Sequence, residues 1–367
     1  MLQPARDRSA YLAQLARAIH TDWPLYALSA AFLGAGVVHL MRSEHSIVGM
    51  LGHYLLQWSF HFGLAGPFVA LTAGIIHIAW RMKGRKRLAY RTLIAPRRLA
   101  RFVAGTLFLM TAGLMFMTTF SAIKTSFSAD GFPYDRVHAD IDKALHLGVD
   151  PFHYLYSFAQ HTWLLRLLEF NYSVVWFVVC YFTLYFVMTS PRAEGVRVRF
   201  GLTWLGTWVI VGIAMAGQWL SAGPVYYGYV TGDTARFADQ IAFLSRTAGS
   251  PGSAHNFQNY LWRLHEAGQG GLGSGISAFP SMHVALVVVV ALFAAERSAR
   301  LGFLAWCYAG IVLFSSVYLG WHYAIDGYAS LLAVSALYWT LRRLMPVLAR
   351  LRWRSPVETD GLVSPAR

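Results

Sequence analysis

Charge is scarce in this sequence. Charged residues make up only 13% of the 367 residues, whereas soluble domains carry about 25%. A chain so poor in charge cannot cover a water-facing surface of its size, which excludes the soluble globular and the disordered classes. Hydrophobic residues account for 56% and aromatic residues for 15%, enough for apolar spans and for aromatic belts at membrane interfaces. The composition predicts a polytopic membrane protein.

Cysteine is scarce as well. Cys180 and Cys307 each lie inside an apolar run, so a disulfide scaffold is excluded.

No motif of a nucleic-acid-binding module accompanies the net charge of +14, and we expect no nucleic-acid partner. The polar residues 1–22 are too many for a cleaved signal peptide ahead of the first apolar run.

Eight apolar runs approach the roughly 20 residues that a helix needs to cross about 30 Å of hydrocarbon. They are residues 25–41, 60–80, 102–123, 171–188, 201–220, 282–295, 301–319 and 323–344. The sequence shows no internal repeat and no soluble domain. We therefore predict an all-α fold of about eight transmembrane helices.

Basic residues crowd into the segment 81–101, between the second and third runs. Placing this loop in the cytoplasm also places most of the 31 Lys and Arg residues there, as the positive-inside rule requires. Anionic lipid head groups are the expected partners of the loop. The long segments 124–170 and 221–280 then face outward. We expect a bacterial inner-membrane protein with its active site on the periplasmic face.

Two segments carry residues suited to chemistry. Residues 277–285 read Ser-Ala-Phe-Pro-Ser-Met-His-Val-Ala and open the sixth run. Residues 318–327 read Tyr-Leu-Gly-Trp-His-Tyr-Ala-Ile-Asp-Gly and join the seventh run to the eighth. The orientation derived from charge places both segments on the external face, although they are far apart in sequence. This agreement predicts that they form one site.

The first segment has the features of a phosphate site. Ser281 is a good N-cap, which leaves the backbone N–H groups of Met282 and His283 free. A helix N-terminus carries partial positive charge and unpaired donors, so it binds phosphate well. We predict that Ser281 and Met282 bind substrate and that His283, in the first helical turn, protonates a leaving oxygen.

The second segment pairs an imidazole with a carboxylate. His322 and Asp326 are four residues apart and therefore share one face of a helix. A carboxylate that accepts a hydrogen bond from one ring nitrogen leaves the other nitrogen unprotonated and nucleophilic. Asp326 also opens an apolar helix, where an unpaired carboxylate is costly. We predict that His322 is a nucleophile and that Asp326 orients it.

These motifs resemble the type-2 phosphatidic acid phosphatase superfamily, in particular its branch of inositol phosphorylceramide synthases. Phe-Pro-Ser-Met-His at 279–283 is similar to the Pro-Ser-x-His motif, and residues 320–326 are similar to the His-x-x-x-Asp motif. The resemblance implies that His322 attacks phosphorus, Asp326 orients it, His283 protonates the leaving group and Ser281 binds phosphate oxygens. Residues 142–151 also resemble a segment of bacterial members.

We expect three parts: a two-helix membrane extension with a basic cytoplasmic loop (1–101), a six-helix catalytic domain (102–345) and a cytoplasmic tail (346–367). We expect no metal and no organic cofactor.

The sequence departs from the family where the family is cationic. The Lys-x6-Arg-Pro motif is absent, and Ser-Ala-Gly-Pro at 221–224 occupies its expected position. Ser316 replaces the Arg six residues before His322, and Met282 replaces a Gly. Phosphoryl transfer needs positive charge near the phosphate. The external candidates for this charge are Lys124, Arg136, Arg236, Arg246, Arg263 and His265.

Because a diester carries less charge than a monoester, these losses favour a diester donor. We predict a lipid phosphotransferase that moves a phospho-head group from a phospholipid to a lipid alcohol through a phosphohistidine. The alternative is a lipid phosphate phosphatase with water as acceptor. A non-catalytic transporter is a remote alternative. It predicts charges at the bilayer midplane and inverted repeats, and neither is evident in the sequence.

These residues allow other interpretations. His283, His322 and Asp326 could ligate zinc, but Ser281 would have no role in such a site. The external acidic residues are Asp130, Asp135, Asp140, Asp142 and Asp150. They lack the spacing of a calcium loop, which favours a solvated segment. The Gly-rich run 268–275 is expected to be a flexible hinge over the site. Trp and Tyr along the spans are expected to be interfacial belt residues.

Overall fold

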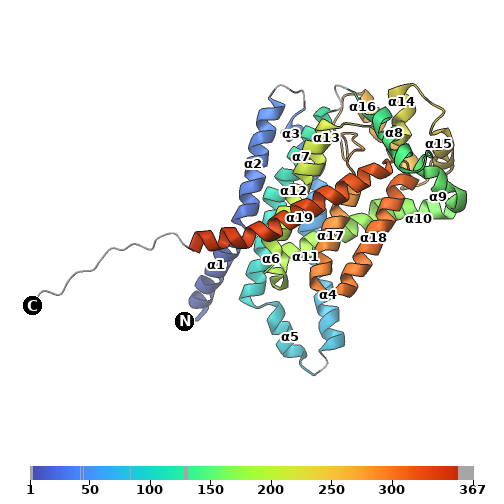
Figure 1. The fold of residues 1–367 in the computed structure, drawn as a ribbon. Coiled ribbons are helices and arrows are strands. Elements are labelled where there is room, and N and C mark those ends of the chain that lie inside the picture. Colours follow the sequence, from blue (N-terminus) through green and yellow to red (C-terminus); the bar gives the residue numbers. More distant parts are fainter. Residues whose placement is uncertain (1–2, 42, 44, 83, 128–130, 354–367) are drawn as a thin grey trace, which may run out of the picture.

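The computed structural model describes residues 3–41, 43, 45–82, 84–127 and 131–353. Every regular element in this part of the chain is helical, which confirms the all-α prediction (Figure 1). Asp130 and the residues of the predicted tail from 354 onward lie outside the described residues.

Within the described ranges, six helical segments are long and apolar enough to cross a membrane. They are α2 (Trp23–Leu40), α3–η1–α4 (Ile47–Trp58, Ser59–Ala65, Gly66–Arg81), α6–η2–α7 (Pro96–Phe108, Leu109–Gly113, Leu114–Ser126), α10–η4–α11 (Thr162–Phe170, Asn171–Val175, Trp176–Thr189), α12–η6–α13 (Arg197–Val209, Ile210–Met215, Ala216–Gln218) and α18 (Ala299–Tyr318). The protein is therefore an integral membrane protein.

The other two predicted runs form α17 (Met282–Arg297) and α19 (Ala324–Trp353). With 16 residues, α17 is short for a spanning helix. It packs against α11, α12, α18 and α19, and most of its apolar side chains are buried. Because protein rather than lipid surrounds it, α17 forms the centre of the bundle, and it carries the first motif at its N-terminus.

The start of the second span differs from the prediction. The second span begins at Ile47 rather than at residue 60, and Ser46 caps it by accepting a hydrogen bond from the Gly49 amide at 2.9 Å. Residues 47–58 are mostly apolar, with His53 and Gln57 as the strongly polar side chains, so the predicted start at residue 60 is too late. The polar N-terminal segment forms α1 (Gln3–Thr21), which packs along α6.

The two long segments between spans are built from short helices. These are α8 (Asp135–Leu145), α9 (Pro151–Ala159), α14 (Tyr227–Thr231), α15 (Ala238–Leu244) and α16 (Ala254–Glu266), with single 3-10 turns at Pro224–Tyr226 and Ser245–Thr247. They gather at one end of the bundle, whereas α5 (Lys86–Leu93) and its basic loop lie at the opposite end (Figure 1). A further 3-10 turn, Pro191–Ala193, follows α11.

Two of the three carboxylates of α8 are buried, those of Asp135 and Asp142, and Asp150 beyond the helix is buried too. The solvated segment expected from the sequence is therefore wrong for these three, whereas Asp140 is exposed as expected. Asp135 accepts hydrogen bonds from the amides of Ala222 and Gly223 at 2.7 and 2.9 Å. Asp142 accepts from two amides at the start of α19, those of Ala324 and Ile325, at 3.0 and 3.1 Å. Residues seven apart share one helix face, so α8 holds both segments with one row of carboxylates.

A buried charge cluster joins the N-terminal helices to the rest of the bundle. Asp22, between α1 and α2, is fully buried and forms ion pairs with Arg101 of α6 and Arg197 of α12. The Arg197 Nε lies 3.0 Å from the Asp22 carboxylate. Arg101 thus differs from the expectation for the basic segment 81–101, because its side chain is buried against Asp22 rather than facing lipid head groups.

Candidate active site

The turn between α18 and α19 presents His322. Gly320 adopts a φ of +68°, and a side chain there would lie 2.6 Å from Val225. The amide of His322 donates to the carbonyl of Ser316 at the end of α18, at 3.2 Å. The turn therefore needs glycine for its conformation and for its close packing, and it leaves the His322 side chain only 7% exposed.

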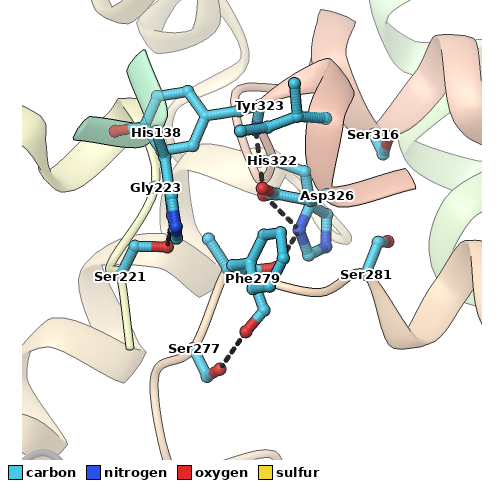
Figure 2. Close-up of polar contacts among 12 residues, drawn as sticks. His138, Ser221, Gly223, Ser277, Phe279, Ser281, Ser316, His322, Tyr323 and Asp326 are labelled. Atoms are coloured by element: carbon cyan, nitrogen blue, oxygen red, sulfur yellow. Dashed lines mark hydrogen bonds and ion pairs between the residues drawn. The ribbon is translucent and has the colours of Figure 1, made fainter. Parts of the chain in front are cut away.

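The ring of His322 is held in one tautomer. Its Nδ1 donates to the carbonyl oxygen of Ala278 at 2.6 Å and lies 3.2 Å from Oδ2 of Asp326 (Figure 2). A carbonyl oxygen only accepts hydrogen bonds, so Nδ1 carries the proton and Nε2 of the neutral ring has a free lone pair. Burial lowers the pKa of His322 to about 3, and the positive charge of Lys124 contributes to this lowering. The ring is therefore neutral and nucleophilic at neutral pH.

Asp326 lies beside His322, as its spacing of four residues predicts. Its Oδ2 also accepts from the amide of Tyr323 at 3.0 Å, and its Oδ1 has no hydrogen-bond partner in the described chain. The shorter contact of the His322 ring is nevertheless to Ala278, which sequence reasoning missed. A backbone carbonyl has no residue-type signature, so no signal in the sequence points to it.

The N-terminus of α17 has the local geometry expected from its sequence. Ser281 is extended and fully buried, and its hydroxyl accepts from the amide of Val284 at 3.4 Å. Among the described residues, no acceptor meets the amides of Met282 and His283. The Met282 side chain is buried, with its sulfur 3.2 Å from where a Cβ on Gly212 would lie. Only the backbone of Met282 is therefore available to a phosphate.

Two aromatic rings hold His283. The ring of Tyr172 stacks on it at a centroid distance of 3.9 Å and an angle of 11°, and the ring of Trp176 lies 4.0 Å away. The indole N–H of Trp176 donates to the carbonyl of His283 at 3.0 Å. The imidazoles of His283 and His322 are close enough to interact electrostatically. The interfacial belt expected for aromatic residues is therefore wrong for these two, which position a candidate acid.

The two motifs are joined directly. The amide of Ser281 donates to the carbonyl of Asp326 at 3.2 Å. The hydroxyl of Ser330 lies 2.9 and 2.7 Å from the carbonyl oxygens of these same residues. All three groups are fully buried. The structure thus brings His283, His322 and Asp326 together with the start of α17.

The positions that replace the family's cations do not supply charge. Ser316 is buried and its hydroxyl donates to the carbonyl of Leu313 within its own helix. The segment 221–224 lies against the site turn, because Gly223, at a φ of +103°, passes close to the carbonyl of Trp321. Ser221 pairs with Nδ1 of the buried His138 at 3.1 Å (Figure 2).

In the described part of the chain, no group of three or more His, Cys, Asp and Glu side chains is arranged to hold a metal ion. The zinc interpretation of His283, His322 and Asp326 therefore gains no support from their geometry. The Nδ1 of His322 is already committed to Ala278 and Asp326.

Comparison with known proteins places these residues in a family. Residues 138–340 match the PAP2 superfamily, and this range holds both motifs, the site turn and α8 from His138 onward. No curated protein and no solved structure matches the chain. The matched range is more than half of the chain, and its two histidines and carboxylate meet in one buried site. The protein therefore belongs to the PAP2 superfamily, a family of phosphatases and phosphotransferases that act on phosphate esters.

Proposed function

We propose that this PAP2 enzyme is a lipid phosphotransferase of the inositol phosphorylceramide synthase type. It moves a phospho-head group from a phospholipid to a lipid alcohol through a phosphohistidine on His322. The observation that carries the proposal is the 2.6 Å hydrogen bond from Nδ1 of His322 to Ala278, because it leaves Nε2 as the free nucleophile.

In the first step, Nε2 of His322 attacks the phosphorus of a phosphodiester. An N–P bond forms, the P–O bond to the diacylglycerol breaks, and His283 gives its proton to the departing oxygen. The free amides at the start of α17 hydrogen-bond the phosphoryl oxygens as negative charge builds up. Asp326 and Ala278 orient the nucleophilic ring.

In the second step, the hydroxyl of a lipid alcohol attacks the phosphohistidine. His283 takes the hydroxyl proton, the N–P bond breaks, and His322 returns to its neutral form. Water could take the place of the alcohol, so a transferase must exclude it.

An aromatic cluster above the site supports the exclusion of water. Trp262 of α16 stacks on Tyr226 and Tyr229, at centroid distances of 5.3 and 4.8 Å. Phe257, on the same helix, lies 6.0 Å from Trp321 in the site turn. Through these ring contacts, α16 packs against α14 and against the turn that carries His322. This packing favours a site that is covered from water.

We further propose that His322 faces the outside of a bacterial inner membrane, and that residues 1–101 are an extension of a catalytic domain at 102–345. The basic loop with α5 lies at the end of the bundle opposite the short helices (Figure 1). Single-cysteine labelling with an impermeant reagent should modify residues near Gly268 and spare residues near Arg87. The reverse pattern would refute the orientation.

The reaction is tested by incubating the purified protein with a labelled lipid extract and identifying the products by mass spectrometry. We expect a phospho-head group to move only when a lipid alcohol is present. His322→Ala should abolish turnover and the trapped phosphoenzyme, whereas His153→Ala, a change of an exposed histidine, should preserve both. Release of free phosphate from a lipid monophosphate, independent of alcohol, would instead establish the phosphatase.

Activity should also persist in EDTA and fall with vanadate, a mimic of five-coordinate phosphorus. Complete loss in EDTA, restored by zinc, would support the metal site instead.

A further inference from the structure

Five of the six candidate cations are engaged by groups other than the two histidines. Arg236 forms ion pairs with Asp140 and Asp150 at 2.6 and 2.8 Å, so two carboxylates already neutralise it. Arg136 donates to the carbonyl of Thr231, and Arg263 donates to the carbonyl of Asn259 within its own helix. These arginines form hydrogen bonds and ion pairs within and between the short helices at this end of the bundle.

The last two of these five lie on aromatic rings. The guanidinium of Arg246 is 5.1 Å from the ring of Phe243. His265 packs against Phe132 and Trp262, at centroid distances of 5.2 and 5.0 Å. Neither has a contact with His283 or His322 among the described residues.

Lys124, in the last turn of α7, has a different environment. Its side chain is partly buried, and its ammonium lies 5.9 Å from the ring of Phe120. Within the described residues, no hydrogen bond or ion pair engages this ammonium. It interacts electrostatically with both His283 and His322. An unpaired charge in a partly buried place is costly unless a counter-ion arrives.

Packing brings the face of α7 that carries Lys124 to the N-terminus of α17. The ring of Phe120 and the sulfur of Met282 both approach Gly212, lying 2.6 and 3.2 Å from the position of a Cβ there. Phe120 is one helical turn before Lys124 on α7, and Met282 is the first residue of α17. The ring against which the ammonium lies therefore packs beside the first residue of α17.

The end of α7 is fixed in place by the Gly-rich run. Gly275, at a φ of +87°, passes so close that a Cβ would lie 2.8 Å from the carbonyl carbon of Lys124. The hydroxyls of Thr125 and Ser274 are 2.8 Å apart, and Ser274 also accepts from the amide of Gly271 at 3.0 Å. The second half of the run, expected to be a flexible hinge, thus packs against the base of Lys124.

We propose that Lys124 is the phosphate-binding cation of this active site and that it sets the charge of the substrate. The inference rests on the proposed function and extends it. One ammonium, together with the helix N-terminus, matches the single negative charge of a phosphodiester better than the two charges of a monoester. Lys124 thereby selects a phosphodiester lipid and steadies the phosphoryl group during attack by His322.

The test measures binding of inorganic phosphate to the full-length protein in detergent by isothermal titration calorimetry. Because Lys124→Met removes a charge-assisted hydrogen bond, we expect phosphate affinity to fall about 10- to 100-fold. Lys124→Arg keeps the charge and should restore most of the affinity, which shows that the loss is not a folding defect. Arg263→Gln, a matched loss of charge at the same end of the molecule, should bind as the wild type does. Wild-type affinity in Lys124→Met would overturn the proposal.

Turnover of a phosphodiester lipid gives the second readout. Lys124→Met should raise KM and lower kcat together, since the ammonium holds the phosphoryl group before and during attack. Phosphate binding requires neither a lipid donor nor an alcohol acceptor. If Lys124→Met loses phosphate binding but the wild type moves no head group, Lys124 is still the phosphate-binding cation and only the transferase proposal fails.

Discussion

Asp326→Asn separates two roles that a carboxylate beside a catalytic histidine can have. It can keep the proton on Nδ1, and it can stabilise the positive charge that builds up on the ring. In this site the carbonyl of Ala278, at 2.6 Å, already keeps the proton on Nδ1 of His322. The carboxylate lies farther away, at 3.2 Å. An asparagine oxygen in the place of Oδ2 would still accept from His322 and from the amide of Tyr323.

The expected loss is therefore modest. Where a carboxylate alone sets the tautomer, this substitution lowers kcat about 10⁴-fold. Here the bond only changes from charged to neutral, a difference of about 1–1.5 kcal/mol. That difference corresponds to roughly a tenfold slower attack. The new NH₂ group replaces Oδ1, which has no partner in the described chain, and an unsatisfied buried donor costs about 1–3 kcal/mol of stability.

Single-turnover formation of the phosphohistidine measures the rate, and thermal unfolding in detergent measures the stability. Asp326→Ala serves as the companion variant, because it removes the contact altogether and should be slower than Asp326→Asn. A 10⁴-fold loss in Asp326→Asn would refute the role assigned to Ala278. An unchanged rate would show that the carboxylate does not assist His322.

Three further predictions follow from other contacts. Asp142→Ala removes the cap of α19, so thermal unfolding should show a loss of about 1–2 kcal/mol and kcat should fall as the first turn of α19 loosens. Because the pKa of His322 is lowered to about 3, its neutral, nucleophilic form persists as the pH falls from 7 to 5. In a pH profile of kcat/KM, an acid limb centred near the ordinary histidine pKa of about 6.5 would contradict this. Asp22→Asn leaves Arg101 and Arg197 buried without their carboxylate, and denaturation should report a loss of about 3–5 kcal/mol.

Local features of this protein could be predicted well from its sequence. The all-α membrane fold follows from the lengths of the apolar runs, because a helix must satisfy its own backbone in lipid. The N-cap at Ser281 and the pairing of His322 with Asp326 follow from spacings within one helical turn. These inferences hold because each depends on residues close together in the chain.

The topology predicted that the two motifs meet, but the individual contacts between distant segments could not be predicted. Asp135 and Asp142 read as members of a solvated acidic segment, yet they are buried because backbone amides far along the chain meet them. The partners of Asp142 are amides of α19, and amides occur at nearly every residue. Residue type alone therefore does not reveal which carboxylates are engaged.

The sequence by itself determined that the chain forms membrane helices, and it predicts two histidines and a carboxylate as the reactive groups, since hydropathy and motif spacing are local properties. Tertiary structure alone decided what surrounds them. Folding brings the carbonyl of Ala278 to His322, the rings of Tyr172 and Trp176 to His283, and one of six basic side chains, Lys124, within electrostatic range of both histidines. The reason is physical: tautomer, orientation and local charge depend on distances through space, which the packing of α7, α11 and α17 creates.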